Sequence, residues 1–153
     1  MIIRETQYQK IPMELLLNAD PSEENILQYL SESRFFAAIE DEETLGACAI
    51  LNQKRTGHKN SVIELMNIAV YALHQGKGIG TALLQHAITV ARTLKAEKMT
   101  VGTGTFGYQL AFYQKLGFRV QSIERDYFIS HYSQTIYESG IQHQDRLILE
   151  LTL

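Results

Sequence analysis

An almost uninterrupted apolar run, "VIELMNIAV" at residues 62–70, leads into the glycine-rich stretch "HQGKGIG" at residues 74–80. Such a run is typical of a strand that is covered on both faces. Apolar residues then recur at helical spacing up to about Lys95, and the expected buried face consists of Ile79, Leu83, Ala87, Val90 and Leu94. A fully covered strand followed by an amphipathic helix predicts an α/β fold.

The rest of the chain predicts one mixed sheet with flanking helices. The expected strands are 1–6, 34–41, 44–55, 61–71, 98–104, 118–128 and 146–151, and the expected helices are 12–20, 21–33, 78–95 and 107–117. The acidic residues 41–43 predict a hairpin, and residues 56–60 predict a loop. No linker or repeat divides the chain, so residues 1–153 are expected to form a single domain.

Two of these helices carry local end signals. Pro21 or Ser22 is expected to open the second helix, which would bury one face formed by Ile26, Leu27 and Leu30. Gly117 is expected to close the helix at 107–117.

The charge and cysteine content exclude several classes of protein. A formal net charge of -3 argues against a nucleic-acid-binding surface. The only cysteine, Cys48, cannot form an internal disulfide, which favours a reducing, cytoplasmic location. No apolar run is long enough to predict a membrane span.

The glycine-rich stretch has the character of an anion-binding turn. A tight turn before a helix leaves backbone N–H groups exposed at the helix N-terminus, where the helix dipole also favours an anion such as phosphate. The missing side chains of Gly76, Gly78 and Gly80 would allow close approach, while Lys77 adds charge and Thr81 a hydroxyl donor. The alternative is a glycine-rich bend that only reverses the chain. The spacing is not that of a P-loop.

The pattern Gln75-x-x-Gly78-x-Gly80 resembles the Q/R-x-x-G-x-G/A signature of the GNAT superfamily of N-acetyltransferases. A second block, "LAFYQKLGF" at residues 110–118, resembles a later helix–strand block of that family. The resemblance implies a single-domain, mostly antiparallel mixed sheet flanked by helices and splayed between its fourth and fifth strands. It also implies acetyl-CoA as the co-substrate. The implied cofactor-binding residues are Ile68, Ala69, Val70, Gln75, Gly76, Lys77, Gly78, Ile79, Gly80 and Thr81.

The resemblance further implies transfer of an acetyl group to a primary amine by direct attack. A bulge in the strand near residues 67–70 would open a slot for the thioester, and backbone N–H groups at 68–70 would stabilise the oxyanion. A plain core strand is the alternative. Many family members carry a cofactor-binding asparagine after the fifth strand. This chain has none at residues 103–108, and Thr105 or Gln109 would have to replace it.

Three side chains are candidates for the chemistry. Tyr113 would protonate the departing CoA thiolate, as the tyrosine of this helix often does in the resembling family; core packing is its alternative role. Glu64, an acidic residue in an apolar strand, would deprotonate the amine directly or through water, and an edge position or an ion pair is its alternative. Asn67 is expected to orient the substrate.

Two rival functions remain open on sequence grounds. A non-catalytic acyl-CoA-binding module would share the same glycine turn. A nicotinamide dinucleotide binder is suggested by G-x-G-x-x-G at residues 102–107, with Glu124 about twenty residues further on. Against it, only the short segment after Gly107 is left to supply the further βα units that such a sheet needs.

The remaining features concern metals, partners and the tail. The five histidines show no metal-ligand spacing, so we predict no metal and expect each histidine at the surface or in a loop. Cys48 is expected to be a small core residue. The polar-aromatic residues 127–143 would wall the acceptor pocket, form a contact in a homodimer, or remain a solvated loop. The acceptor is expected to be a small-molecule amine.

Overall fold

The computed structural model describes residues 1–53 and 61–153, so the loop expected at residues 56–60 lies outside the described residues. The chain divides into two compact units, Met1–Glu97 together with Leu153, and Lys98–Thr152. Each unit is described by itself below. The prediction of a single domain stays a prediction.

The first unit contains a four-stranded antiparallel sheet in the order β1-β2-β3-β4. Its strands are β1 (Ile2–Thr6), β2 (Arg34–Glu40), β3 (Glu43–Gln53) and β4 (Val62–Val70), and its α-helices are α1 (Met13–Leu17), α2 (Glu23–Tyr29) and α3 (Ile79–Thr93). Short 3₁₀ turns lie at Tyr8–Lys10, Leu30–Glu32 and Ala72–His74. The hairpin predicted at the acidic residues is confirmed, because Glu40 pairs with Glu43 across a two-residue turn.

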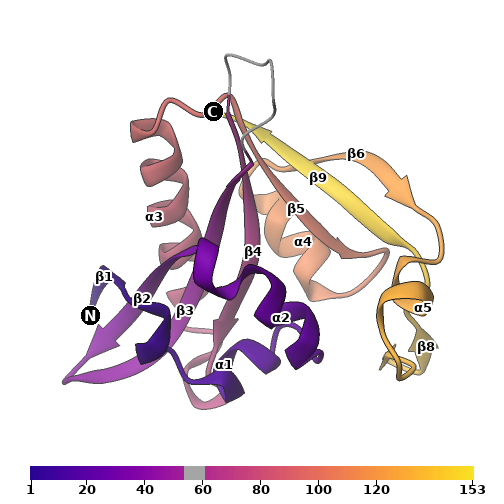
Figure 1. Ribbon diagram of the computed structural model, residues 1–153, viewed down its shortest axis with the longest axis horizontal. Helices are drawn as coiled ribbons and strands as arrows, with labels where there is room; N and C mark the ends of the chain where they lie inside the picture. The colour runs from indigo at the N-terminus through magenta and orange to yellow at the C-terminus, as the bar shows by residue number, and fades with distance from the viewer. Residues whose placement is uncertain (54–60) are drawn as a thin grey trace. The chain divides into compact units, whose positions relative to one another are not determined.

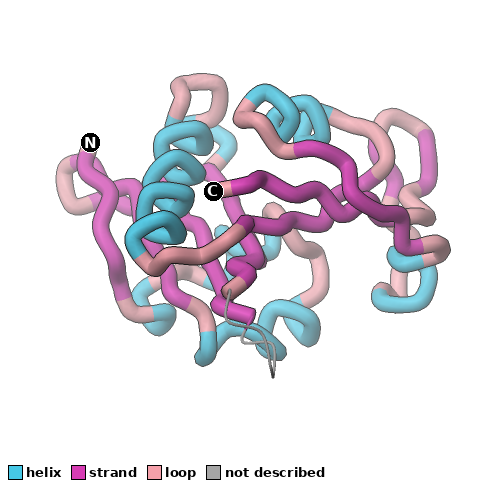
Figure 2. The backbone as a smooth tube through the Cα atoms, turned by 90° about the horizontal axis from the view of Figure 1, so that it is seen from above, coloured by secondary structure: helices cyan, strands magenta, loops and turns pink. Residues whose placement is uncertain are grey.

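Helices cover both faces of this sheet (Figures 1 and 2). Side chains alternate between the faces along each strand. Phe35 and Ala37 of β2 join the core cluster beneath α1 and α2, whereas Phe36 packs edge-on against His86 of α3 at 5.0 Å between ring centroids. The strand predicted to be covered on both faces is β4, and this prediction is confirmed, because α1 packs on β4 from one face of the sheet and α3 from the other (Figure 1).

For the helices of this unit, the predicted end signal is confirmed, whereas the predicted buried faces are partly wrong. Ser22 caps α2, because its side chain accepts a hydrogen bond from the backbone N–H of Asn25 at 3.2 Å. The predicted burial of Leu27 is wrong: its side chain is 56% exposed, and Tyr29 takes its place in the core beside Ile26. Leu94 is exposed as well, because α3 ends at Thr93.

The second unit contains a three-stranded antiparallel sheet in the order β5-β9-β6. Its strands are β5 (Lys98–Gly104), β6 (Arg119–Glu124) and β9 (Arg146–Thr152), and its helices are α4 (Tyr108–Lys115) and α5 (Tyr127–His131). Gly117 follows α4 with φ 98°, which confirms the predicted helix stop. A small hairpin pairs β7 (Tyr137–Glu138) with β8 (Ile141–Gln142).

The strand predicted at residues 118–128 is too long. β6 ends at Glu124, and the chain turns at Asp126, which has φ 59° and precedes α5 (Figure 1). The backbone N–H of Asp126 donates to the carboxylate of Asp145 at 2.8 Å, and the N–H of Phe128 donates to the carbonyl of Gln144 at 3.0 Å. These contacts between distant parts of the tail convert the expected strand end into a helix.

Candidate functional site

The glycine turn joins β4 to α3, and two of its glycines are required by the backbone. Gly76 and Gly78 have φ values of 74° and 83°, in the left-handed region that residues with a Cβ disfavour. A Cβ at either glycine would meet no atom of the described chain within 4 Å. These glycines therefore allow the left-handed backbone of the turn, and the space above them is open.

The start of α3 offers backbone donors to that open space. The first intrahelical bond runs from the N–H of Ala82 to the carbonyl of Gly78 at 3.0 Å. Gly78 is the N-cap residue and has no side chain to accept from the N–H groups of the first turn. The N–H groups of Ile79, Gly80 and Thr81 consequently lack the helical partners that later amides have, which suits them to an anion.

The polar side chains of the turn differ in what they contact. The side-chain amide of Gln75 donates to the carbonyl oxygen of Val70 at 2.9 Å and so ties the turn to the end of β4. Lys77 and Thr81 are exposed. The structure thus gives Gln75 a structural contact, while Lys77 and Thr81 are accessible to a ligand.

A β-bulge interrupts the pairing of β4. Ala49 of β3 lies opposite Asn67, and the next residue, Ile50, lies opposite Leu65. Met66 is therefore an extra residue on β4 without a partner on β3. The structure places the bulge directly before the region in which we expected it.

The bulge decides which face carries the two polar side chains of β4. In a regular strand, Glu64 and Asn67 would point to opposite faces, because they are three residues apart. Here Glu64 lies opposite Leu51 and Asn67 lies opposite Ala49, and both β3 residues pack in the cluster beneath α1 and α2. Glu64 and Asn67 consequently share the face that α1 and α2 cover.

The end of β4 also has a defined backbone polarity. The N–H of Tyr71 donates to the carbonyl of Leu45 on β3 at 3.0 Å. Backbone groups alternate along an antiparallel strand, so the N–H groups of Ile68 and Val70 point to the edge of β4 away from β3. Ala69 points its N–H toward β3.

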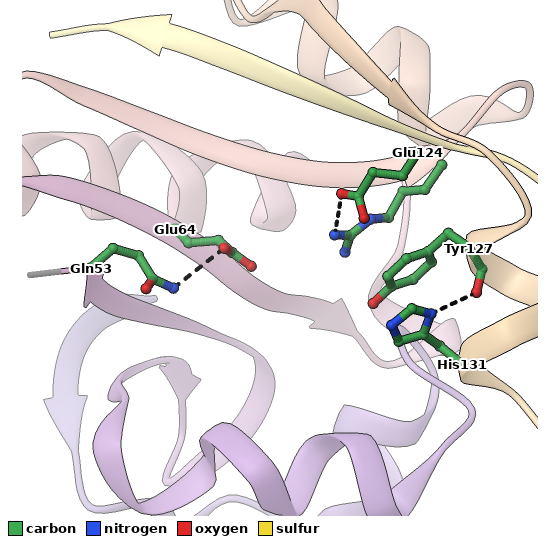
Figure 3. Close-up of polar contacts among 6 residues, drawn as sticks. Gln53, Glu64, Glu124, Tyr127 and His131 are labelled. Carbon is green, nitrogen blue, oxygen red and sulfur yellow. Dashed lines mark hydrogen bonds and ion pairs between the residues drawn. The ribbon is translucent and has the colours of Figure 1, made fainter. Parts of the chain in front are cut away.

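Glu64 and Asn67 differ in their surroundings. Glu64 is half-buried, and its carboxylate accepts a hydrogen bond from the side-chain amide of Gln53 at 3.4 Å (Figure 3). Asn67 is only 4% exposed, and its amide nitrogen donates to the carbonyl of Leu16 at 3.1 Å and to the hydroxyl of Tyr29 at 3.0 Å. The carbonyl of Leu16 can only accept, which fixes the orientation of the amide. The Asn67 Oδ1 atom is buried with no hydrogen-bond partner in the described part of the chain.

Tyr113 belongs to the second unit and is buried. It lies in the last turn of α4 and is 5% exposed. Its ring contacts Phe112 and Phe118 edge-on, at 5.3 Å and 5.8 Å between centroids. The packing role considered for Tyr113 is thus present in the structure, and its role as an acid stays a prediction.

The G-x-G-x-x-G segment at residues 102–107 is occupied by side chains of the chain itself. A Cβ at Gly102 would lie 2.7 Å from Nη1 of Arg146, and one at Gly107 would lie 2.5 Å from the carboxylate of Glu138. The imidazole of His143 covers Gly104 in the same way. These glycines therefore accommodate tail residues, and the segment does not present the open backbone that a dinucleotide needs.

The sequence did not point to the cluster formed by these tail residues. His143 lies in a loop, as predicted, but its side chain is buried, only 8% exposed. Arg146 donates to Glu124 at 2.7 Å, and its guanidinium lies 3.7 Å from the ring centroid of Tyr127. Tyr127 in turn stacks on His131 of α5 (Figure 3). Alternate glycines in β5 were the signal that bulky side chains cover this strand.

Cys48 is fully buried in β3, as predicted for a core residue. Burial raises the pKa of its thiol to about 12, so the reactive thiolate is absent at neutral pH. Within residues 1–53 and 61–153, no group of three or more histidine, cysteine or acidic side chains is placed to hold a metal ion. None of the helices in the same residues has the length and apolar character to span a membrane.

Comparison with known proteins identifies similar domains and folds. Residues 31–120 match the family described as "Acetyltransferase (GNAT) domain". The chain is 38% identical over 141 residues to a curated Bacillus subtilis protein, the uncharacterized N-acetyltransferase YvbK, covering 92% of this chain and 88% of that protein.

Two solved structures are similar over almost the whole chain. An IAA acetyltransferase from Bacillus cereus has 40% identity and a TM-score of 0.90, with 99% of each chain covered. A GNAT family acetyltransferase from Elizabethkingia anophelis, with acetyl-CoA bound, has 35% identity and a TM-score of 0.89, covering 99% of this chain and 97% of that one. The predicted mixed, mostly antiparallel sheet flanked by helices is thereby confirmed. The splay between β4 and β5 concerns both units and stays a prediction.

Proposed function

Because the chain belongs to the GNAT superfamily of acetyltransferases, we propose that it transfers the acetyl group of acetyl-CoA to a primary amine of a small molecule. The amine attacks the thioester directly, with no covalent enzyme intermediate, and binding orients the two substrates for the reaction. The observation that carries this proposal is the turn between β4 and α3, whose left-handed Gly76 and Gly78 leave free amides facing open space.

The turn holds the diphosphate of the cofactor. The N–H groups of Ile79, Gly80 and Thr81 donate to phosphate oxygens at the positive end of α3, and Lys77 adds a cation. Gly80 lies inside the helix and is absent from the residues with positive φ, so the backbone does not require a glycine there. A ligand that approaches the first turn of α3 explains its missing side chain. The bound acetyl-CoA of the Elizabethkingia relative supports this cofactor.

The thioester arm lies along β4. The N–H groups of Ile68 and Val70, which point away from β3, pair with the pantetheine and stabilise the oxyanion that forms on the acetyl carbonyl. Ala69 lines the same stretch. Gln75 contributes by bonding to Val70 and holding the turn against the strand end.

Three side chains have proposed roles in the reaction. Tyr113 protonates the CoA thiolate as the tetrahedral intermediate breaks down, and Glu64 removes a proton from the amine. Asn67 accepts an N–H of the acceptor through its unpartnered Oδ1, since its other polar atom is already bonded. The bulge at Met66 supports a shared role, because it brings Glu64 and Asn67 to one face of β4.

The acceptor follows from the charge on this face. A half-buried carboxylate and a buried carbonyl oxygen favour a cationic amine with N–H donors. The chain has a net charge of -3 and no basic excess, so the acceptor is a small amine and not a nucleic-acid-bound one. We place the protein in the cytoplasm, where acetyl-CoA is present and a free thiol such as that of Cys48 stays reduced. A homodimer stays a prediction.

Calorimetric titration with CoA and with acetyl-CoA tests the cofactor site. Wild-type protein is expected to bind both, and Gly78→Ala to bind each about tenfold more weakly or worse. Gly140→Ala is the matched control, because Gly140 has φ 78° and equally open surroundings but lies in the β7–β8 turn. It should lose similar stability and keep its affinity. Wild-type protein that gives no heat with either ligand would overturn the proposal.

Thiol release with a series of amines tests turnover. An amine substrate should yield free CoA with wild-type protein, and Tyr113→Phe should lower kcat. Cofactor binding without turnover on any amine would instead favour an acyl-CoA-binding module.

A further inference from the structure

The G-x-G-x-x-G segment at residues 102–107 is covered by three tail side chains and has no role in the proposed cofactor site. Arg146 lies over Gly102, His143 over Gly104 and Glu138 against Gly107. All three come from the part of the chain after α5, whereas the glycines lie at the end of β5 and at the start of α4. The tail is thereby attached to the junction between β5 and α4.

His143 makes the most specific of these contacts. Its ring is parallel to that of Phe106, with 4.2 Å between centroids and 5° between planes. Its Nε2 lies 2.9 Å from the Glu138 carboxylate, and its Nδ1 is buried with no hydrogen-bond partner in the described residues. At this distance an N–H at Nε2 donates to the Glu138 carboxylate. Phe106 and Glu138 in turn both border Gly107.

The start of α4 needs such support. Its N-cap residue is Gly107, with φ 106° and no side chain to accept a hydrogen bond, and its first turn contains no acidic residue. A helix of eight residues is marginal without packing. The carboxylate of Glu138 lies beside this helix N-terminus, where the helix dipole favours a negative charge. His143 holds that carboxylate in place.

We propose that the His143–Glu138 pair is a positioning clamp: it fixes the N-terminus of α4 and, through this short helix, the orientation of the Tyr113 hydroxyl. The clamp rests on the proposed function for its effect on catalysis. His143 and Glu138 do not touch the reacting atoms and act only through α4. Loss of the clamp should therefore change turnover much more than cofactor affinity.

The activity test separates kcat from KM. His143→Phe keeps an aromatic ring against Phe106 but loses the bond to Glu138, and it should lower kcat on the order of tenfold, since small misplacements of a reacting group are costly. The KM for acetyl-CoA should stay within about twofold, because the turn that binds the cofactor belongs to the other unit. His143→Gln retains an N–H donor for Glu138 and should recover most of kcat. His131→Phe, at an exposed histidine of α5, is the control.

Hydrogen exchange of the backbone amides tests the clamp without activity. In His143→Phe and in Glu138→Leu, which removes the acceptor, amides at the start of α4 should exchange about fivefold faster or more, while those of α3 stay unchanged. Unchanged exchange in α4 would overturn the clamp. So would equal acceleration in all helices, which would mean global destabilisation.

The two tests also distinguish failure of the clamp from failure of the proposed function. If wild-type protein binds CoA but acetylates no amine, the proposed acetyl transfer is refuted. The hydrogen-exchange result would still decide whether the His143–Glu138 clamp exists. Faster exchange in α4 with unchanged kcat would show that Tyr113 does not depend on the clamp and would overturn the positioning role.

Discussion

The side-chain amide of Asn67 on β4 donates to the hydroxyl oxygen of Tyr29 on α2 at 3.0 Å, in the buried layer between sheet and helices. The same nitrogen donates to the carbonyl of Leu16 at the end of α1. One buried side chain therefore joins both N-terminal helices to the strand proposed to bind the thioester. Its Oδ1 atom is buried with no hydrogen-bond partner among the described residues.

Replacement of this amide should be costly. Asn67→Asp places a carboxylate oxygen against the carbonyl of Leu16, where a donor is needed, and buries a charge. We expect a loss of about 2–4 kcal/mol in the free energy of unfolding, measured by urea denaturation. Asn52→Asp, at an exposed position on β3, should change stability by less than about 0.5 kcal/mol. Similar losses for both variants would contradict the burial argument.

The ionisation of Tyr29 should make the fold sensitive to alkali. Burial raises the pKa of Tyr29 to about 12, and the hydrogen bond from Asn67 acts in the opposite direction. A pKa raised above its unfolded value of about 10 means that the contribution to stability is complete below pH 10 and is lost as the pH rises toward 12. Tyr29→Phe should flatten this decline, as seen in denaturation curves between pH 9 and 12. A wild-type curve that does not fall in this window would exclude the effect.

Cys48 should not react with thiol reagents in the folded protein. It is fully buried, and its pKa of about 12 keeps the thiol protonated at pH 8. With an aromatic disulfide reagent we expect no reaction under native conditions and one thiol per chain in denaturant. The same reagent can then follow CoA release without background from the protein. Rapid labelling of native protein would show that β3 opens readily.

Glu64 should be needed for turnover but not for cofactor binding. Glu64→Gln keeps the shape of the side chain and removes the proposed base, so kcat/KM for the amine should fall roughly 100-fold. The CoA affinity measured by calorimetry should stay the same. Glu5→Gln, at an exposed acid paired with Arg34 at 2.8 Å, is the control and should retain activity. Full activity in Glu64→Gln would assign proton removal to water or to another group.

The glycines of β5 should differ in their tolerance of a methyl group. Gly104→Ala must displace the buried ring of His143, whereas Gly102→Ala meets the flexible end of Arg146. We expect Gly104→Ala to cost about 1–3 kcal/mol in the free energy of unfolding and Gly102→Ala to cost less. Thermal and urea denaturation of the two variants provide the comparison. The reverse order would mean that the ring moves more easily than the guanidinium.

Local signals in the sequence determined much of this protein. The turn at residues 74–80 could be predicted because left-handed backbone at Gly76 and Gly78 demands glycine, and the start of α2 because Ser22 caps it. The apolar run at residues 62–70 predicted β4, because a strand that is buried on both faces has a continuous apolar pattern. Each of these signals is carried by residues that lie within a short stretch of the sequence.

Only the tertiary structure decided which side chains meet. The bulge at Met66 brings Glu64 and Asn67 to one face, and it depends on pairing with β3 and not on any local residue type. The end of β6 depends on contacts within the tail, where Asp126 and Phe128 bond to Asp145 and Gln144. The burial of His143 depends on its contact with Gly104 of β5, about forty residues earlier in the chain. Long-range packing decides these positions, because polar side chains such as that of His143 would remain exposed to solvent without their distant partners.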